Sequence, residues 1–236
     1  MKTTIKLLAV ALVTAVIAVS CGSGSDTETN QISQAKDVAE MTGGVYSVDT
    51  EASIINWKGE KFNGDFHIGT ISVKEGTLSV EDGAITGGNF TIDMNSIEVT
   101  DETPDDKKAY LTAHLKGTSK SDIDGDFFQV TKYPTASFEI TGVEGNEISG
   151  NLTMLDSTHN VTFTATTSIE NGVLTATTDK FTFDRTQWGI VFMSTITGFV
   201  KEKALKNEIE ISIKLTANAA GEATEGEATE EEATKE

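Results

Sequence analysis

The chain has 236 residues, of which 37 are acidic and 18 are lysine or arginine, so its formal net charge is −19. This charge repels phosphate backbones and argues against nucleic acid as a partner. The single cysteine excludes an internal disulfide, and the stability of the fold must therefore come from a packed apolar core.

The N-terminus has the pattern of a secretory signal. Lys2 and Lys6 precede an apolar run, and the small-residue stretch Ala18-Val19-Ser20 leads directly into Cys21. The run spans about thirteen residues, which is shorter than the roughly 20 residues that a membrane-spanning helix needs. We therefore expect residues 1–20 to be a signal peptide that is removed.

This segment resembles the signal of bacterial lipoproteins. The resemblance implies that Cys21 becomes an acylated N-terminus, and several acyl chains on one residue would anchor the protein stably to a membrane. In such lipoproteins a residue like Gly22, rather than an acidic one, favours sorting to the outer membrane, facing the periplasm or the cell surface. The alternative is an ordinary cleaved signal with an incidental cysteine.

Composition divides the remaining chain into three parts. Residues 21–43 are rich in Ser, Gly, Thr, Asp and Gln, which predicts a flexible tether behind the anchor. Residues 218–236 form an acidic, low-complexity tail ending in GEATEGEATEEEATKE, which cannot bury enough apolar surface to fold. Residues 44–217 remain as one folded domain.

The domain shows the alternation of antiparallel strands, with one apolar face on each strand. The alternating apolar positions are Phe90, Ile92 and Met94, then Ala136, Phe138 and Ile140, then Ile148, Leu152 and Met154, then Val161, Phe163 and Ala165, and finally Ile209, Ile211, Ile213 and Leu215. Asp82-Gly83, Glu144-Gly145-Asn146 and Asn171-Gly172 have the composition of hairpin turns. An open sheet of such strands would leave raw edges, so we predict an all-β fold closed into an antiparallel barrel.

One stretch departs from the β pattern. Between Thr103 and Asp126 the chain is highly charged, and Tyr110, Leu111, His114 and Leu115 have the i, i+4 spacing of one helical face. We therefore predict one short helix within a long loop that crosses the surface or covers a barrel mouth.

Several ordered segments of the domain resemble the YceI-like family. They are YSVDTEASIINWKG, FHIGTISVKEG, GGNFTIDMNSIEVTD, HLKGTSKSDIDGDFFQVTKYPTASFEITG, GNLTMLDSTHNVTFTA and FDRTQWGI, within roughly residues 44–217. The most specific stretch is DFFQVTKYPTASFEI. The resemblance implies an elongated, lipocalin-like barrel whose apolar cavity holds a polyisoprenoid or another long amphiphile, such as a fatty acid or amide.

One turn departs from the family pattern. Where the family has a glycine-containing turn, this chain has Leu155-Asp156-Ser157-Thr158-His159. Aspartate tolerates turn geometry, including the left-handed region, better than most residues other than glycine, so we expect the fold to survive this change, while the identity of the ligand stays open.

A cavity for a long hydrocarbon needs an apolar lining and a few polar groups that orient a head group. The aromatic and aliphatic candidates for this lining are Trp57, Phe90, Ile92, Phe127, Phe128, Phe138, Leu152 and Phe163. The alternative for each of them is simple core packing, since a small barrel can be filled by its own side chains.

Arg185 is a polar candidate, because it lies in the segment FDRTQWGI that matches an arginine-containing motif of the family. A guanidinium can bind two phosphate oxygens at once, which would orient a diphosphate head group. The competing interpretation is structural, either a salt bridge or stacking on Trp188.

The sequence gives little support to metal binding or catalysis. His67, His114 and His159 show no paired zinc spacing, and Asp122, Asp124 and Asp126 lack the glycine and glutamate positions of an EF-hand. No nucleophile elbow is present. We therefore expect neither metal nor cofactor, and the alternatives to a lipid carrier are a structural or interaction lipoprotein with a filled barrel or, less favoured, a hydrolase of lipid-like substrates.

Overall fold

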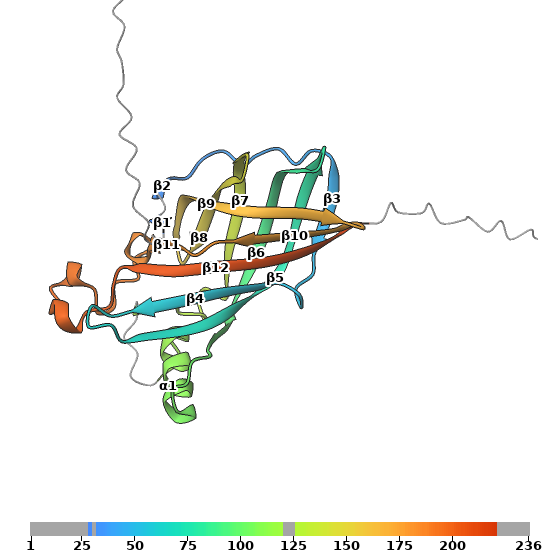
Figure 1. The fold of residues 1–236 in the computed structure, drawn as a ribbon. Coiled ribbons are helices and arrows are strands. Elements are labelled where there is room, and N and C mark those ends of the chain that lie inside the picture. The colour runs from blue at the N-terminus through green and yellow to red at the C-terminus, as the bar shows by residue number, and fades with distance from the viewer. Residues whose placement is uncertain (1–27, 30–31, 120–125, 221–236) are drawn as a thin grey trace, which may run out of the picture.

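Figure 1 shows the fold in a computed structural model, which describes residues 28, 29, 32–119 and 126–220. The predicted signal peptide, Cys21, Asp122, Asp124 and nearly all of the acidic tail lie outside these residues. The long strands are β4 (Ile54–Glu60), β5 (Phe66–Glu81), β6 (Ala84–Val99), β7 (Thr135–Glu144), β8 (Glu147–Met154), β9 (Ser157–Glu170), β10 (Val173–Thr178) and β12 (Glu208–Ala219). The shorter elements are β1 (Glu28–Thr29), β2 (Ile32–Gln34), β3 (Gly44–Val48) and β11 (Phe181–Asp184), the helix α1 (Asp105–Lys116), and the 3-10 helices η1 (Arg185–Trp188), η2 (Thr195–Thr197) and η3 (Lys201–Lys203).

The strands form one sheet that closes on itself. Strand β12 pairs with β10 and β11 on one side and with β3 and β4 on the other, and both β3 and β4 pair with β5. Because β5 continues through β6, β7, β8 and β9 back to β10, the ring is complete and antiparallel. The predicted all-β, lipocalin-like barrel with one short helix is confirmed.

The three predicted hairpins are present and lie at one end of the barrel, which we call the hairpin end. Asp82 and Asn171 take positive φ angles of 50° and 51°, each followed by a glycine with positive φ. Residues of this kind adopt the left-handed region readily, and such turns match the twist of the paired strands. Local sequence therefore sets the register of these hairpins.

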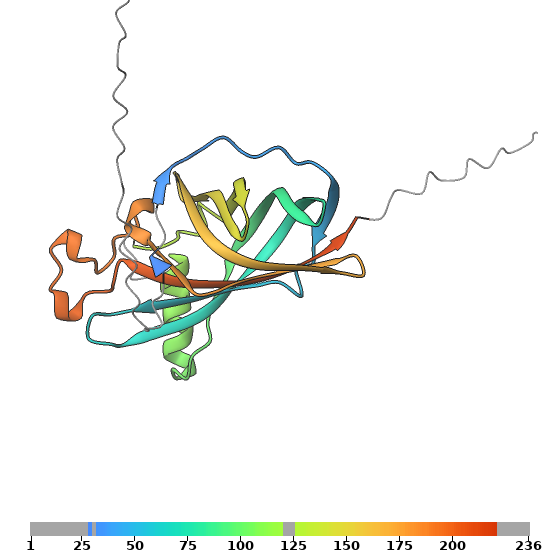
Figure 2. The same cartoon turned by 45° about the horizontal axis from the view of Figure 1, so that its top comes forward.

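The opposite end, which we call the loop end, is built from irregular segments. It contains the β4–β5 turn at residues 61–65, helix α1 with the segment 126–134, the β8–β9 turn at 155–156 and the long connection 185–207 (Figure 1). The two views agree that the connection between β11 and β12 projects beyond the strand ends beside the β4–β5 turn (Figure 2).

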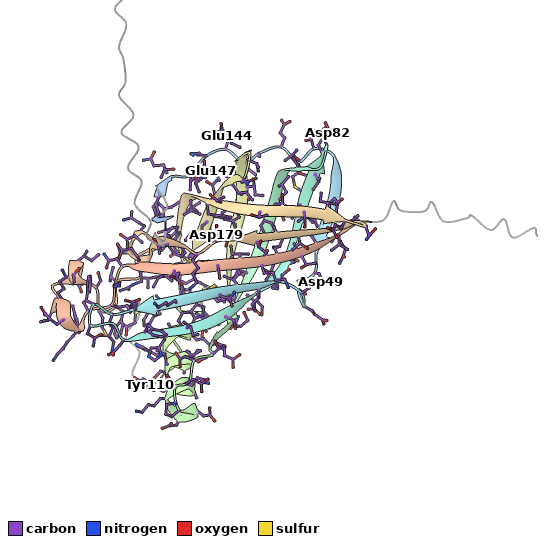
Figure 3. All side chains as sticks on the ribbon, viewed as in Figure 1. Asp49, Asp82, Tyr110, Glu144, Glu147 and Asp179 are labelled. Atoms are coloured by element: carbon purple, nitrogen blue, oxygen red, sulfur yellow. The ribbon has the colours of Figure 1, made fainter. Side chains whose placement is uncertain are left out.

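Helix α1 lies within the predicted segment, but only part of the helical face that we predicted is buried. His114 and Leu115 are buried and Leu111 is half-buried, whereas Tyr110 is 56% exposed and points away from the barrel (Figure 3). Tyr110 lies one residue before Leu111 and so falls at the edge of the buried stripe. It stacks on His114 from outside, with ring centroids 6.1 Å apart.

The β8–β9 turn keeps its shape in a way that the sequence did not predict. Met154 pairs with Ser157, so the two-residue turn is Leu155-Asp156, and the left-handed residue is Leu155, with a φ of 52°. Leucine has a β-carbon that clashes in this region, unlike glycine. The fold therefore survives the change at this turn, as expected, but Leu155 rather than Asp156 takes the left-handed conformation.

The predicted flexible tether is partly ordered. Residues 32–43 run across the outside of the sheet as a strap: β2 pairs with β9, and the amide of Ala39 donates to the carbonyl of Ile140 at 2.9 Å. Oδ1 of Asn151 accepts a hydrogen bond from the amide of Lys36 at 3.0 Å, and Nδ2 of Asn151 donates to the carbonyl of Lys36 at 2.7 Å. The polar composition of residues 32–43 did not predict this ordered segment, because hydrogen bonds to residues far away in the sequence hold it in place.

Candidate ligand-binding cavity

The barrel encloses a cavity of about 400 Å³. Its walls come from the inward faces of β4 to β12, from α1 and from the connection 185–207, and they are apolar apart from a few side chains. All eight predicted lining residues contribute to the wall: Trp57, Phe90, Ile92, Phe127, Phe128, Phe138, Leu152 and Phe163. Alternation along each strand therefore identified the inward face, while contact with a ligand stays a prediction.

A row of phenylalanine rings crosses the cavity wall. The rings of Phe90, Phe138, Phe163 and Phe181 follow one another with centroid separations of 6.3, 5.6 and 4.8 Å. Gly150 makes room for this row, because a β-carbon there would lie 2.1 Å from Cζ of Phe138. Phe181 was not among the predicted lining residues, although Phe181 and Phe183 alternate like the other inward pairs.

A second aromatic group lines the cavity at the loop end, beside α1. His114 of α1, Phe127 and Phe192 come from three separate segments, and their ring centroids lie 4.8–5.1 Å apart. Phe128 is hydrogen-bonded to helix α1, since its amide donates to the carbonyl of Leu115 at 3.1 Å. The helix and the segment 126–130 therefore form one wall of the site.

The indole of Trp57 forms part of the wall between β4 and β5. Its ring lies directly over Gly69, where a β-carbon would approach Cζ2 to 2.4 Å. Trp57 is 9% exposed, and its Nε1 meets no acceptor among the described residues. An unpaired buried N–H of this kind costs about 1–3 kcal/mol, so the apolar packing of the ring must offset it.

Arg185 lies on the cavity wall, but its guanidinium is occupied by backbone oxygens. Nη1 donates to the carbonyl of Ile190 at 2.6 Å, Nη2 to that of Phe192 at 2.9 Å, and Nε to that of Lys206 at 3.2 Å. The side chain is 2% exposed, and burial lowers the pKa of Arg185 to about 10. The described residues provide it with neither a carboxylate ion pair nor a ring contact with Trp188. It instead joins the start of the connection 185–207 to its middle and its end, and so fixes the fold of this connection.

The polar lining residues gather at the loop end. Lys61 and His67 both line the cavity, and their side chains are 36% and 41% exposed, so the cavity approaches solvent between them. Nδ1 of His67 lies 2.8 Å from Oδ2 of Asp101. Burial opposes ionisation of Asp101, but hydrogen bonds from Thr103, His67 and Ile68 outweigh it and hold the pKa of this carboxyl well below its usual range.

A lysine pair neutralises the acid next to this opening. Glu60 accepts from Lys206 and from Lys58, each at 2.7 Å, and these two hydrogen bonds lower the pKa of Glu60. Because both ion pairs are partly exposed, they contribute little stability. They do fix the β4 end against the start of β12.

The three histidines lie in separate surroundings. His67 faces Asp101, His114 lies in the aromatic group, and Nε2 of His159 lies 3.0 Å from the carbonyl oxygen of Gln187. Within residues 32–119 and 126–220 no cluster of His, Cys, Asp and Glu could hold a metal ion.

Fold and cavity together define an all-β barrel with an internal apolar chamber and a polar opening at one end. The sequence-family model of the YceI-like domain matches residues 46–217 of this chain. The chain therefore belongs to the YceI-like family. No curated protein matches the sequence.

Two solved structures are similar in fold. BcnA of Burkholderia cenocepacia shares 18% identity with a TM-score of 0.53, over 72% of this chain and 99% of that one. A polyisoprenoid-binding domain of Saccharophagus degradans, described as implicated in plant cell wall breakdown, shares 13% identity with a TM-score of 0.52, over 78% of this chain and all of the other.

Proposed function

We propose that this protein is a lipid-binding protein that holds a long apolar amphiphile, a polyisoprenoid or a fatty acid or amide, inside its barrel. One observation carries the proposal: the inward side chains leave a chamber of about 400 Å³ that they do not fill. Ligand sites of small molecules typically measure roughly 300–1,000 Å³ and are mostly apolar with a few placed polar groups. The chamber has this size and this lining.

The arrangement of polar groups favours an amphiphile over a pure hydrocarbon. Phenylalanine rings line the interior, whereas Lys61 and His67 lie at the loop end where the cavity approaches solvent. A hydrocarbon chain would lie among the rings and a polar head group would lie near the lysine and histidine. The polyisoprenoid-binding domain of Saccharophagus degradans, with a similar fold, supports this choice of ligand class.

Anchoring is part of the proposal. An acylated Cys21 would tether the domain to a membrane of the bacterial cell envelope, with the outer membrane favoured by Gly22, and the ligand would be carried or held there. No helix among the described residues is long and apolar enough to span a bilayer. We propose a carrier or sequestering role rather than an enzymatic one.

The two alternatives predict different interiors. A structural lipoprotein with a filled barrel is disfavoured by the unfilled chamber. A hydrolase would need an activated nucleophile in the chamber, and the side chains that line it are overwhelmingly apolar.

Native mass spectrometry of the full chain purified from membranes tests the proposal. We expect a bound species, released by organic solvent, whose mass corresponds to an isoprenoid or acyl chain. A protein that carries no extractable amphiphile, and takes up neither a polyprenol nor a fatty amide from detergent solution, would contradict it.

A cavity-filling variant provides the matched control. Ala165 faces the chamber and its neighbour Thr166 faces solvent on the same strand. Ala165→Phe fills part of the chamber and should reduce bound ligand at least tenfold, whereas Thr166→Phe adds the same ring outside and should leave binding unchanged. Equal ligand content in both variants would place the ligand outside the barrel.

A further inference from the structure

The loop end carries an exposed apolar surface, which we call the tip. It consists of Phe62, Phe66 and Ile68 from the β4–β5 region and of Ile196, Phe199 and Val200 from the connection between β11 and β12. Their exposed fractions range from 38% for Ile68 to 62% for Val200. More than half of the large exposed apolar side chains among the described residues lie here, and such a concentration marks an interaction surface.

The two halves of the tip form one fixed unit. Lys61 and Leu205 form an isolated β-bridge, the amide of Phe62 donates to the carbonyl of Ala204 at 3.1 Å, and the amide of Lys206 donates to the carbonyl of Glu60 at 2.8 Å. The tip residues therefore lie on two adjoining segments, the β4–β5 turn with the start of β5 and the connection between β11 and β12, whose backbones lie side by side in Figures 1 and 2.

Lysines accompany the phenylalanines of the tip. Nζ of Lys58 lies 4.8 Å from the ring centroid of Phe66, and Nζ of Lys201 lies 5.2 Å from that of Phe62. Aromatic rings with lysines beside them suit the boundary between lipid head groups and acyl chains, because the ring enters the apolar layer while the ammonium stays among the head groups.

Charge separates the two ends of the molecule. The tip region carries five lysines, Lys58, Lys61, Lys201, Lys203 and Lys206, against three acids, Glu60, Asp65 and Glu202, and so has a net charge of about +2 in a chain whose net charge is −19. The hairpin end presents acidic side chains instead, with Asp82, Glu144 and Glu147 pointing outward (Figure 3). An anionic lipid surface would therefore attract the tip and repel the opposite end.

The start of the described chain lies on the tip side. Glu28 and Thr29 pair with Phe181 and Thr182 of β11, which leads directly into the connection that bears the tip. Cys21 is seven residues before Glu28, a reach of at most about 25 Å for an extended chain. An anchor at Cys21 would thus hold this end of the barrel near the bilayer.

We propose that the tip docks into the interfacial layer of a lipid bilayer and turns the cavity opening toward it. The wall residues Lys61, Met193 and Leu205 belong to the same two loops as the tip, so the opening and the docking surface are continuous. This inference deepens the proposed function, because a docked opening lets an amphiphile pass between membrane and barrel without crossing water.

Fluorescence quenching by brominated lipids tests the orientation. The full chain is reconstituted into phosphatidylcholine vesicles with bromine near the top of the acyl chains, as the variant Phe199→Trp and as the control Val173→Trp at the hairpin end. The parent chain gives the background of the buried Trp57 and Trp188. We expect Phe199→Trp to lose more than half of its added fluorescence and Val173→Trp to lose almost none.

Each other outcome overturns the proposal. Equal quenching at the two positions would mean that the tip does not face the bilayer. Protection of Phe199→Trp that grows with the protein-to-lipid ratio would instead assign the tip to a second copy of this chain. The measurement needs no bound ligand, so it stands even if the cavity proves to hold none.

A second pair of variants connects docking with ligand passage. Replacing Phe66 and Phe199 by serine removes two exposed rings, and replacing Val45 and Val173 by serine removes exposed apolar side chains at the other end. We expect the first pair to slow uptake of a fluorescent polyprenol from vesicles at least fivefold, with unchanged uptake from detergent solution and unchanged thermal unfolding. Unaltered uptake from vesicles would contradict the role of the tip.

Discussion

The hairpin end and the loop end of the barrel differ in which residues take left-handed backbone angles. At the hairpin end the left-handed turn positions outside glycine are Asp82 and Asn171, and the nearby residues Leu78, Leu174 and Ala217 are at most 1% exposed. At the loop end the left-handed residues are Gln129, Leu155 and Met193, whose side chains suit that conformation poorly. Both ends are well buried, since Trp188 and Ala204 at the loop end are also at most 1% exposed. The difference lies in the turns, because the loop end carries backbone strain of a kind that clusters at functional sites.

The largest expected effect comes from removing a fully buried side chain at the hairpin end. Leu174→Ala should lower the free energy of unfolding by about 3 kcal/mol, because the residue is 0% exposed and leaves a cavity. Leu205→Ala at the loop end faces a chamber that already exists and should cost about half as much. Urea unfolding of both variants measures the difference, and equal losses would remove the contrast between the ends.

Arg185→Lys should have the next largest effect. A lysine ammonium cannot reach the carbonyl oxygens of Ile190, Phe192 and Lys206 together, so the free energy of unfolding should fall by about 2 kcal/mol. Because the guanidinium is engaged with backbone, binding of a polyprenyl diphosphate and of the matching alcohol should weaken by the same factor. A selective loss of the diphosphate in titration would restore the head-group role for this arginine.

Exchanges at two turns should produce the smallest effects, with opposite signs. Gln129→Gly relieves a φ of 46° at a polar residue outside the hydrophobic core and should raise the free energy of unfolding by up to about 1 kcal/mol. Gly83→Ala introduces a β-carbon at a φ of 81° with no neighbour within 4 Å, and should lower it by about 1 kcal/mol. Thermal unfolding of the two variants at one pH checks the signs. Stabilisation by both, or by neither, would show that strain is not distributed as described.

Sequence predicted the regular part of the molecule well. Alternation along strands such as β7 and β8 follows from the two-residue period of the backbone, so the residue pattern alone suffices to assign Phe138 and Leu152 to the interior. The turn residues around Asp82 and Asn171 likewise carry their own conformational preference.

The remaining features depend on contacts between distant segments. Nothing near Lys36 in the sequence reveals that Asn151 accepts a hydrogen bond from its amide. The residues around Arg185 do not show that three carbonyl oxygens converge on its guanidinium. The aromatic contact of Phe192 with His114 joins segments that only the closed barrel brings together. Such features require the tertiary structure because no local pattern encodes them.

The position of the last strand has a practical consequence. The amide of Ala219 donates to the carbonyl of Gly172 and that of Ala220 to the carbonyl of Val45, each at 2.8 Å, so β12 finishes among the hairpins. A reporter or affinity handle fused after residue 220 would therefore be joined to the pole farthest from the chamber's polar rim. Immobilising the protein on a sensor chip through that handle should leave the rim free to meet vesicles flowing past.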